Sequence, residues 1–263
     1  MTSPIRFSFI VSCYNLEKYI GVCLDSLLRQ NYPADDFEII CIDDGSEDSS
    51  YETILKIAKG HSNIRFFKTE NSGLERTCNR AIGLSQNDLI VRVDADDILD
   101  REYLSVMNRA IQSRPQYDFY YCQDYVEYYS ESRQQAKSVP AFDGEEIFSR
   151  GDFFATATVY RKEQLKAIGF FPDTIKNCGL ENYHVILKLI SSGKRGLAVP
   201  EASFYYRRHL TNMSTVKQQA IIDYGHKLLA QYGRKFQTNE FHPYGLRLNE
   251  NAGMQKKRNL LRK

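Results

Sequence analysis

The chain has 263 residues, of which 42% are hydrophobic and 26% charged, enough to bury the core of one large domain or two small ones. Its 35 basic and 33 acidic side chains give a net charge of +2, which excludes the strong basic field of a nucleic-acid-binding protein. The six cysteines form no C-x-x-C pair, so neither a zinc site nor a disulfide framework is predicted. No apolar run approaches a membrane span of about 20 residues, and the N-terminus lacks a signal-peptide core, so we expect a cytoplasmic protein.

The first 99 residues alternate between apolar, β-branched runs and amphipathic segments. Strands are predicted at 5–12, 37–42, 64–67 and 89–93, and helices at 16–28, 51–58 and 74–82. Asn15 is expected to cap the first helix, and Ser72 with Glu75 has the form of a capping box for the third. This alternation predicts an α/β fold with parallel strands joined by helical crossovers.

Polar clusters follow three of these strands, at 12–15, 43–46 and 94–97. The carboxyl ends of parallel strands meet at one rim of a sheet, where α/β proteins bind their ligands. We therefore expect the three clusters to converge on one site.

Asp94 and Asp96 are two residues apart at the end of the last of these strands. Two neighbouring carboxylates repel each other unless a proton or a divalent cation lies between them, and Mg²⁺ or Mn²⁺ favours oxygen ligands. The alternative is structural: Asp97 caps a helix that begins near Asp100, and the other two carboxylates are solvated.

Six motifs in order make the chain resemble the family-2 glycosyltransferases over residues 5–212. They are F-I-V-S-C-Y-N (9–15), I-D-D-G-S (42–46), E-N-S-G-L (70–74), V-D-A-D-D (93–97), G-L-E-N-Y-H-V-I-L-K-L (179–189) and Y-Y-R-R-H-L-T-N-M-S (205–214). The resemblance implies a GT-A, Rossmann-like fold, in which a mostly parallel sheet is flanked by helices and followed by a C-terminal helical extension. It divides the chain into a nucleotide-sugar-binding half (1–115), an acceptor-binding half (116–215) and the extension (216–263).

The same resemblance implies an enzyme that moves a sugar from a UDP- or dTDP-sugar to an acceptor hydroxyl with inversion, assisted by Mn²⁺ or Mg²⁺. Such transfer commonly builds a polysaccharide or another glycoconjugate on a saccharide or lipid-linked saccharide acceptor. The implied nucleotide-binding residues are Ser12, Tyr14, Asn15, Asp43, Asp44, Arg76, Asp94 and Ala95. The implied metal ligands are Asp96, Asp94 and His209, with His209 following an Arg-Arg pair that would lie near the diphosphate.

The catalytic segment departs from the family pattern. Relatives commonly have Glu-Asp at the start of a helix, with the Asp as base, whereas this chain has Glu181 and Asn182. An amide cannot accept the acceptor's proton, so Glu181 is the favoured base and His184 the second candidate. The alternative for Glu181 is a first-turn acid stabilised by the helix dipole. A second departure is Cys78, which stands where relatives carry an Arg that Arg76 or Arg80 would replace.

The remaining segments are less informative. A helix is expected over 103–111, and the tyrosine-rich stretch 117–129 favours a half-exposed strand pair, with a sugar-stacking wall as the alternative. Residues 153–161 resemble the strand that frames the donor sugar. An amphipathic helix is expected over 216–229, and the basic tail 254–263 is either a solvated terminus or a contact to anionic lipid.

Two other classes of function fit the same features. A nucleotidylyltransferase would also join an α/β fold to carboxylate-bound Mg²⁺, although no glycine-rich basic loop is seen near the N-terminus. A sugar-nucleotide-binding protein without catalysis is the more serious alternative, because Asn182 could mark lost chemistry.

Overall fold

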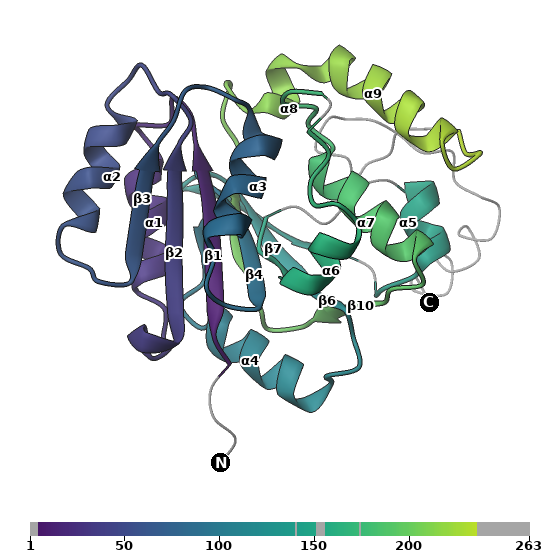
Figure 1. Cartoon of the computed structure of the whole chain (residues 1–263), viewed down its shortest axis with the longest axis horizontal. Coiled ribbons are helices and arrows are strands. Elements are labelled where there is room, and N and C mark those ends of the chain that lie inside the picture. Colours follow the sequence, from purple (N-terminus) through teal and green to yellow (C-terminus); the bar gives the residue numbers. More distant parts are fainter. Residues whose placement is uncertain (1–4, 140, 151–155, 174, 236–263) are drawn as a thin grey trace.

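The computed structural model describes residues 5–139, 141–150, 156–173 and 175–235 (Figure 1). In chain order its elements are β1 (Phe7–Cys13), α1 (Ile20–Leu28), η1 (Ala34–Asp36), β2 (Phe37–Asp43), α2 (Ser50–Ala58), β3 (Ile64–Lys68), α3 (Leu74–Leu84), β4 (Leu89–Asp94), β5 (Ile98–Leu99), α4 (Tyr103–Ser113), β6 (Phe119–Cys122), β7 (Asp124–Ser130), β8 (Arg133–Ser138), α5 (Gly144–Arg150), β9 (Thr158–Arg161), α6 (Lys162–Ala167), α7 (Glu181–Ser191), β10 (Gly196–Val199), β11 (Phe204–Arg207), α8 (Met213–Val216) and α9 (Gln218–Ala230).

Two sheets organise the described residues. The main sheet has the strand order β10-β6-β9-β4-β1-β2-β3, and β9 runs antiparallel to both of its neighbours while the other pairs are parallel. The second sheet has the order β5-β11-β7-β8. The predicted α/β fold with a mostly parallel sheet is confirmed.

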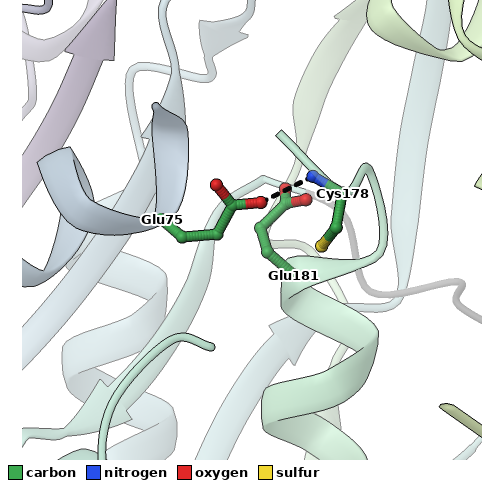
Figure 2. Close-up of side chains that lie close together, drawn as sticks. All are labelled: Glu75, Cys178 and Glu181. Carbon is green, nitrogen blue, oxygen red and sulfur yellow. Dashed lines mark hydrogen bonds between the residues drawn. The ribbon is translucent and has the colours of Figure 1, made fainter. Parts of the chain in front are cut away.

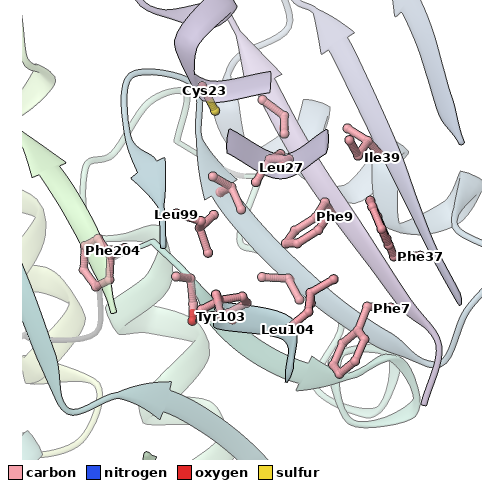
Figure 3. Close-up of a cluster of buried hydrophobic side chains, with 14 of the residues drawn as sticks. Phe7, Phe9, Cys23, Leu27, Phe37, Ile39, Leu99, Tyr103, Leu104 and Phe204 are labelled. Carbon is pink, nitrogen blue, oxygen red and sulfur yellow. Dashed lines mark hydrogen bonds between the residues drawn. The ribbon is translucent and has the colours of Figure 1, made fainter. Parts of the chain in front are cut away.

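The main sheet is buried on both faces because its strands alternate apolar side chains between two layers. Phe7 and Phe9 of β1 lie in a cluster with α1 and α4, which Figure 3 shows around Leu27 and Tyr103. Ile10 belongs to the second cluster, which includes side chains of α3 and α7. Figure 1 accordingly shows α1 and α3 on opposite faces of the sheet. Packing on both faces restricts how far each strand end can shift along the strand direction relative to its neighbours.

The polar clusters do meet at one rim. In the strand register Ser12 is opposite Ile42 of β2 and opposite Asp94 of β4, and Cys13 is opposite Asp43. The carboxyl ends of three strands therefore present their following loops side by side, as the sequence predicted.

The predicted start of the first helix is wrong. α1 begins at Ile20 without a side-chain cap. Asn15 instead has a left-handed backbone (φ 53°). Its backbone N–H donates to Ser46 Oγ (2.9 Å), and its side-chain Oδ1 accepts from the backbone N–H of Glu47 (2.9 Å). Asn15 joins the loop after β1 to the loop after β2, a role that depends on tertiary contact.

The predicted capping box is also wrong. α3 begins at Leu74, next to Gly73, and has no side-chain cap. The Ser72 hydroxyl donates to Asp44 Oδ1 (3.1 Å), and Glu75 Oε1 accepts from the backbone N–H of Cys178 (2.7 Å). Both side chains are recruited by segments far away in the sequence.

The tyrosine-rich stretch does not form a strand pair. β6 lies in the main sheet with Tyr120 and Tyr121 buried, whereas β7 belongs to the second sheet. Of the stretch expected to frame the donor sugar, 156–161 is described and ends in β9, while 153–155 lies outside the described residues.

The C-terminal segment forms α8 and α9, shown in yellow-green in Figure 1. The predicted amphipathic face is confirmed for Ile221, Tyr224 and Leu228, which are buried, but Val216 is 62% exposed. The basic tail 254–263 lies outside the described residues. No helix in the described ranges combines the length and the apolar character needed to cross a membrane.

Candidate functional site

A cleft of about 490 Å³ opens above the carboxyl ends of β1, β2 and β4. A volume of several hundred Å³ suits a small-molecule ligand. Its lining residues come from the strand ends, the start of α3, the segment leading into α7 and the segment after β11: Ser12, Tyr14, Asn15, Leu16, Asp44, Asn71, Leu74, Arg92, Asp94, Ala95, Asp96, Asn177, Gly179, Glu181, Tyr206, His209, Thr211, Asn212, Met213, Val216 and Lys217. The cleft is thus built from both halves of the chain.

Asp44 is held rigidly at the edge of the cleft and is 2% exposed. Its Oδ1 accepts from the Ser72 amide (2.9 Å) and Ser72 Oγ (3.1 Å), and its Oδ2 accepts from the Gly73 amide (2.9 Å). Gly73 has φ +95°, and a Cβ there would lie 2.5 Å from Lys176 Cγ, so glycine is required for this turn. We call Asp44, Ser72 and Gly73, with Thr69 whose hydroxyl reaches Oδ1 at 3.4 Å, the Asp44 network.

Asp96 and His209 form a pair of potential metal ligands in the cleft. His209 Nε2 lies 2.9 Å from Asp96 Oδ2, and Asn212 Nδ2 donates to the same oxygen at 3.2 Å. The Tyr19 ring stacks on the imidazole at a centroid distance of 4.4 Å. Carboxylate oxygen and imidazole nitrogen are donors that divalent metals accept, so these residues fit a cation.

Asp97 turns away from that pair. It is 1% exposed, and its Oδ1 accepts from the Arg207 amide at 2.9 Å. Burial, together with the charge of Asp96, raises the pKa of the Asp97 carboxyl well above its usual value. The alternative of Asp97 as a helix cap is wrong, because α4 begins at Tyr103 without a side-chain cap.

Arg92 is the functional candidate that sequence reasoning missed. It lies in β4 and is 3% exposed, yet it lines the cleft. Its Nη2 donates to Asp94 Oδ1 (2.6 Å) and to Glu181 Oε1 (3.0 Å). Burial disfavours its charge, but the two carboxylates raise the pKa of Arg92 well above its ordinary value, so it stays a cation. The available signal was a charged residue inside an apolar strand, which requires a buried partner.

Glu75 and Cys178 complete the surroundings of Glu181 (Figure 2). Glu75 Oε1 accepts from the Cys178 amide (2.7 Å), and its Oε2 accepts from the Asn177 amide (2.8 Å), so α3 holds the loop before α7. Ligand atoms of Glu75, Cys178 and Glu181 lie within 4.8 Å of one another and by type could also bind a metal. In the structure, however, the positive charge beside Glu181 belongs to Arg92.

This setting raises the pKa of Glu181 to about 7. Burial is the main cause, the charges of Glu75 and Asp94 add to it, and Arg92 opposes it. Glu181 Oε2 is buried and accepts no hydrogen bond from the described residues. A carboxylate poised near neutral pH with one unengaged oxygen has the properties of a general base. We call Arg92, Asp94, Glu181, Glu75 and Cys178 the Arg92 network.

The cleft gathers most of the site residues predicted from the sequence. Those lining it are Ser12, Tyr14, Asn15, Asp44, Asp94, Ala95, Asp96, Glu181 and His209. Those that do not line it are Asp43, Arg76, Asn182 and His184. Asp43 is fully buried below the turn after β2, where its Oδ2 accepts from the Ser46 amide at 3.2 Å.

The other three predicted residues also lie outside the cleft lining. Arg76 is directed to Asp173, at 3.6 Å, with 62% of its side chain exposed. Asn182 is buried in the first turn of α7. His184 Nδ1 lies 2.6 Å from the Tyr224 hydroxyl, and burial lowers its pKa to about 4. Arg92 rather than Arg76 lies beside Cys78.

Comparison with known proteins identifies the family. The model of "Glycosyl transferase family 2" matches residues 8–169, more than half of the chain. The chain therefore belongs to glycosyltransferase family 2.

Individual relatives agree with this assignment. Over 102 residues the chain is 38% identical to the poly(ribitol-phosphate) beta-glucosyltransferase of Bacillus spizizenii, a match covering 38% of this chain and 16% of that relative. The structure of S. aureus TarS 1-349 in complex with UDP-GlcNAc superposes with a TM-score of 0.70 at 21% identity, covering 88% of this chain and 67% of that one. The mannosyltransferase PcManGT from Pyrobaculum calidifontis, in complex with GDP-Man and Mn²⁺, gives 0.65 at 19% identity, covering 92% and 70%. These neighbours confirm the GT-A fold.

Proposed function

We propose that the protein is a glycosyltransferase that moves a sugar from a nucleoside diphosphate sugar to an acceptor hydroxyl with inversion at the anomeric carbon. The observation that carries this proposal is Glu181, a buried carboxylate with one unengaged oxygen, in the same cleft as Asp44, Asp96 and His209. A base, a nucleotide-binding edge and a cation site are the three parts that such a transfer requires.

The nucleoside would bind at the Asp44 network. Within the described residues Asp44 Oδ2 accepts one hydrogen bond, from Gly73, and a carboxylate oxygen has a second lone pair for a base N–H. A uracil or thymine ring offers such an N–H, which supports a UDP- or dTDP-sugar as donor. Tyr14, which is 43% exposed at the cleft, would contribute stacking area against the nucleoside.

A divalent cation, Mn²⁺ or Mg²⁺, would be held by Asp96 and His209, with Asp94 beside them. When bound, the ion supplies positive charge that stabilises the departing diphosphate. Arg92 already neutralises part of the charge of Asp94, since its guanidinium nitrogens lie 2.6 and 3.4 Å from the carboxylate oxygens. The side chain best placed to receive the ion is therefore Asp96.

The transfer itself follows from the protonation state of Glu181. Its carboxylate removes the proton from the acceptor hydroxyl as that oxygen forms a bond to the anomeric carbon. The bond between the anomeric carbon and the diphosphate oxygen breaks, and its electron pair leaves with the nucleoside diphosphate. Attack from the side opposite the leaving group gives inversion. Asn182 takes no part, because an amide cannot accept the proton.

The biological setting is proposed from the relatives. Two of them, from Bacillus spizizenii and Staphylococcus aureus, are transferases named for poly(ribitol-phosphate), so we propose an acceptor within a polysaccharide or another glycoconjugate, free or lipid-linked. The division into donor half 1–115, acceptor half 116–215 and extension 216–263, a cytoplasmic location and membrane contact through the basic tail belong to the same proposal.

A sugar-nucleotide-binding protein without catalysis is the second candidate, favoured by Asn182 at the position where an aspartate base was expected. A panel of UDP-, dTDP- and GDP-sugars, each with and without Mn²⁺, separates the two. Thermal stabilisation identifies the donor, because a ligand that binds the native state raises Tm by mass action. Mass spectrometry then follows release of the nucleoside diphosphate with saccharide acceptors. Metal-dependent stabilisation with turnover supports the transferase; stabilisation without turnover for any donor supports the binding protein.

A further inference from the structure

Arg92 is a charged residue in a position where burying a charge is unfavourable. Its neighbours in β4 are buried and apolar, and the guanidinium is itself 3% exposed. A buried cation is retained only where partners compensate its lost hydration. Here the partners are two carboxylates that both line the cleft, so the cation serves the site and not only the core.

One nitrogen of Arg92 makes both of the short contacts. Nη2 carries two hydrogens, and it lies 2.6 Å from Asp94 Oδ1 and 3.0 Å from Glu181 Oε1. Asp94 ends β4, whereas Glu181 begins α7, which is 89 residues away from Arg92. The shared nitrogen therefore fixes the relative position of two segments that the backbone does not connect.

In the described part of the chain, Arg92 is the only side chain that forms an ion pair with Glu181. Its Oε1 accepts a hydrogen bond from Arg92 Nη2, and its Oε2 has no hydrogen-bond partner among the described residues. Removing Arg92 would remove the ion pair that orients the Glu181 carboxylate within its buried setting. Misplacement of a reacting group by about 1 Å costs on the order of 100-fold in rate.

We infer that Arg92 is a positioning residue for the proposed transfer: it holds Glu181 against the donor-binding carboxylate Asp94 through one shared nitrogen. The inference rests on the proposed function, in which Glu181 is the base. It adds a distinct statement, namely that Arg92 acts on the rate through Glu181.

A double-mutant cycle tests that statement. Arg92→Leu is expected to lower kcat on the order of 100-fold. In a Glu181→Gln background the same substitution is expected to lower kcat less than about threefold further, because residues that act through one another are not additive. A factor that is the same in both backgrounds would overturn the inference.

Rescue from a different element is the second test. Cys78 on α3 is buried, and its thiol lies against the Arg92 guanidinium. The double variant Arg92→Leu with Cys78→Arg is designed to bring a guanidinium from α3 to the same pair of carboxylates, into part of the space that the Arg92 guanidinium occupied. We expect at least tenfold recovery of kcat over Arg92→Leu alone. No recovery, with a Tm equal to that of the natural protein, would overturn the inference.

Controls separate folding and base chemistry from positioning. Arg65, which pairs with Glu38 at 3.2 Å outside the cleft, is the matched arginine, and Arg65→Leu is expected to change kcat less than about threefold. If Arg92→Leu does not fold, Arg92→Lys keeps the charge without the planar fork and is expected to lose about tenfold in kcat. Full activity in Glu181→Gln would disprove the proposed function, whereas full activity in folded Arg92→Lys and Arg92→Leu would disprove this inference alone.

Discussion

The two networks at the cleft differ in how the charge of their carboxylates is compensated. In the Asp44 network one carboxylate accepts hydrogen bonds from Ser72 and Gly73, two of them from backbone amides, so its charge is well satisfied. In the Arg92 network a single guanidinium pairs with two carboxylates, of Asp94 and Glu181, and Glu75 adds a third negative charge near Glu181. The first network holds one carboxylate with several hydrogen bonds, and the second has more carboxylates than cations.

This difference suits the proposed division of work. A group that recognises a nucleoside must keep one orientation, and hydrogen bonds from a loop hold it in place. A group that removes a proton must be close to protonation near neutral pH, and burial among like charges provides that. Variants in the two networks should therefore fail in different ways.

The largest expected effect is in the Arg92 network. Glu181→Gln keeps the shape of the side chain but removes the base, so transfer should fall by about 10² to 10⁴-fold while donor binding stays within about twofold. Initial rates and thermal shift with the donor measure the two separately. Glu38→Gln is the matched control, since Glu38 is also buried but lies outside the cleft. Retained transfer in Glu181→Gln would place the base elsewhere.

Asp96 tests the part of the cleft between the two networks. Asp96→Ala removes the oxygen that faces His209 at 2.9 Å, so Mn²⁺-dependent stabilisation by a nucleoside diphosphate should disappear. Loss of an outer-shell partner typically weakens metal affinity by about 10 to 100-fold, so loss of a direct ligand is expected to weaken the apparent affinity by at least that much. Calorimetric titration with and without Mn²⁺ measures it, with Asp118→Ala, a surface residue paired with Lys194, as the control. Unchanged metal dependence would refute the assignment.

Sequence reasoning identified the Asp44 region more fully than the Arg92 network. The strand alternation and the polar strand ends are local patterns, so the convergence of Ser12, Asp44 and Asp94 followed from topology. Local patterns also misled: Asn15, Ser72 and Glu75 each have the form of a helix cap, but tertiary hydrogen bonds take their side chains elsewhere.

The Arg92 network could not be assembled from the sequence, because its members come from α3, β4, α7 and the loop before α7, and no spacing relates them. What the sequence did hold was the anomaly of an arginine within an apolar strand. Such a residue predicts a buried acidic partner but not its identity. The family resemblance and the chemistry of a carboxylate favour Glu181 as base, but its raised pKa depends on neighbours that only the folded chain provides.

Asp44→Asn tests the donor-binding role of the Asp44 network. The amide keeps one acceptor but turns an N–H₂ group toward the Gly73 N–H or the Ser72 donors, which costs roughly 1–3 kcal/mol. Donor affinity should fall by about 10 to 100-fold, whereas kcat at saturating donor should stay within about threefold. Steady-state kinetics at varied donor concentration separate KM from kcat. A fall in kcat with unchanged KM would contradict the assignment of Asp44 to donor binding.

The pH dependence of transfer should report Glu181 of the Arg92 network. Because the pKa of Glu181 is raised to about 7, its base form is lost as pH falls through that value. At saturating donor, kcat should reach a plateau above pH 8 and be half-maximal near pH 7. Below that it should fall about tenfold for each pH unit. Donor stabilisation measured over the same range controls for binding. A kcat that does not change between pH 5.5 and 7 would contradict the assignment of Glu181 as the base.

His184 provides the smallest expected effect and decides between the two candidate bases. It does not line the cleft, its Nδ1 pairs with the Tyr224 hydroxyl at 2.6 Å, and burial with the charge of Lys188 lowers its pKa to about 4. A base that weak gives little help near neutral pH. Tyr224→Phe and His184→Gln should each change kcat less than about threefold and destabilise the fold by about 1 kcal/mol, the contribution of one buried hydrogen bond. Thermal unfolding and initial rates measure both. A hundredfold loss of kcat in His184→Gln, with donor binding intact, would transfer the role of base from Glu181 to the helix position one turn further on.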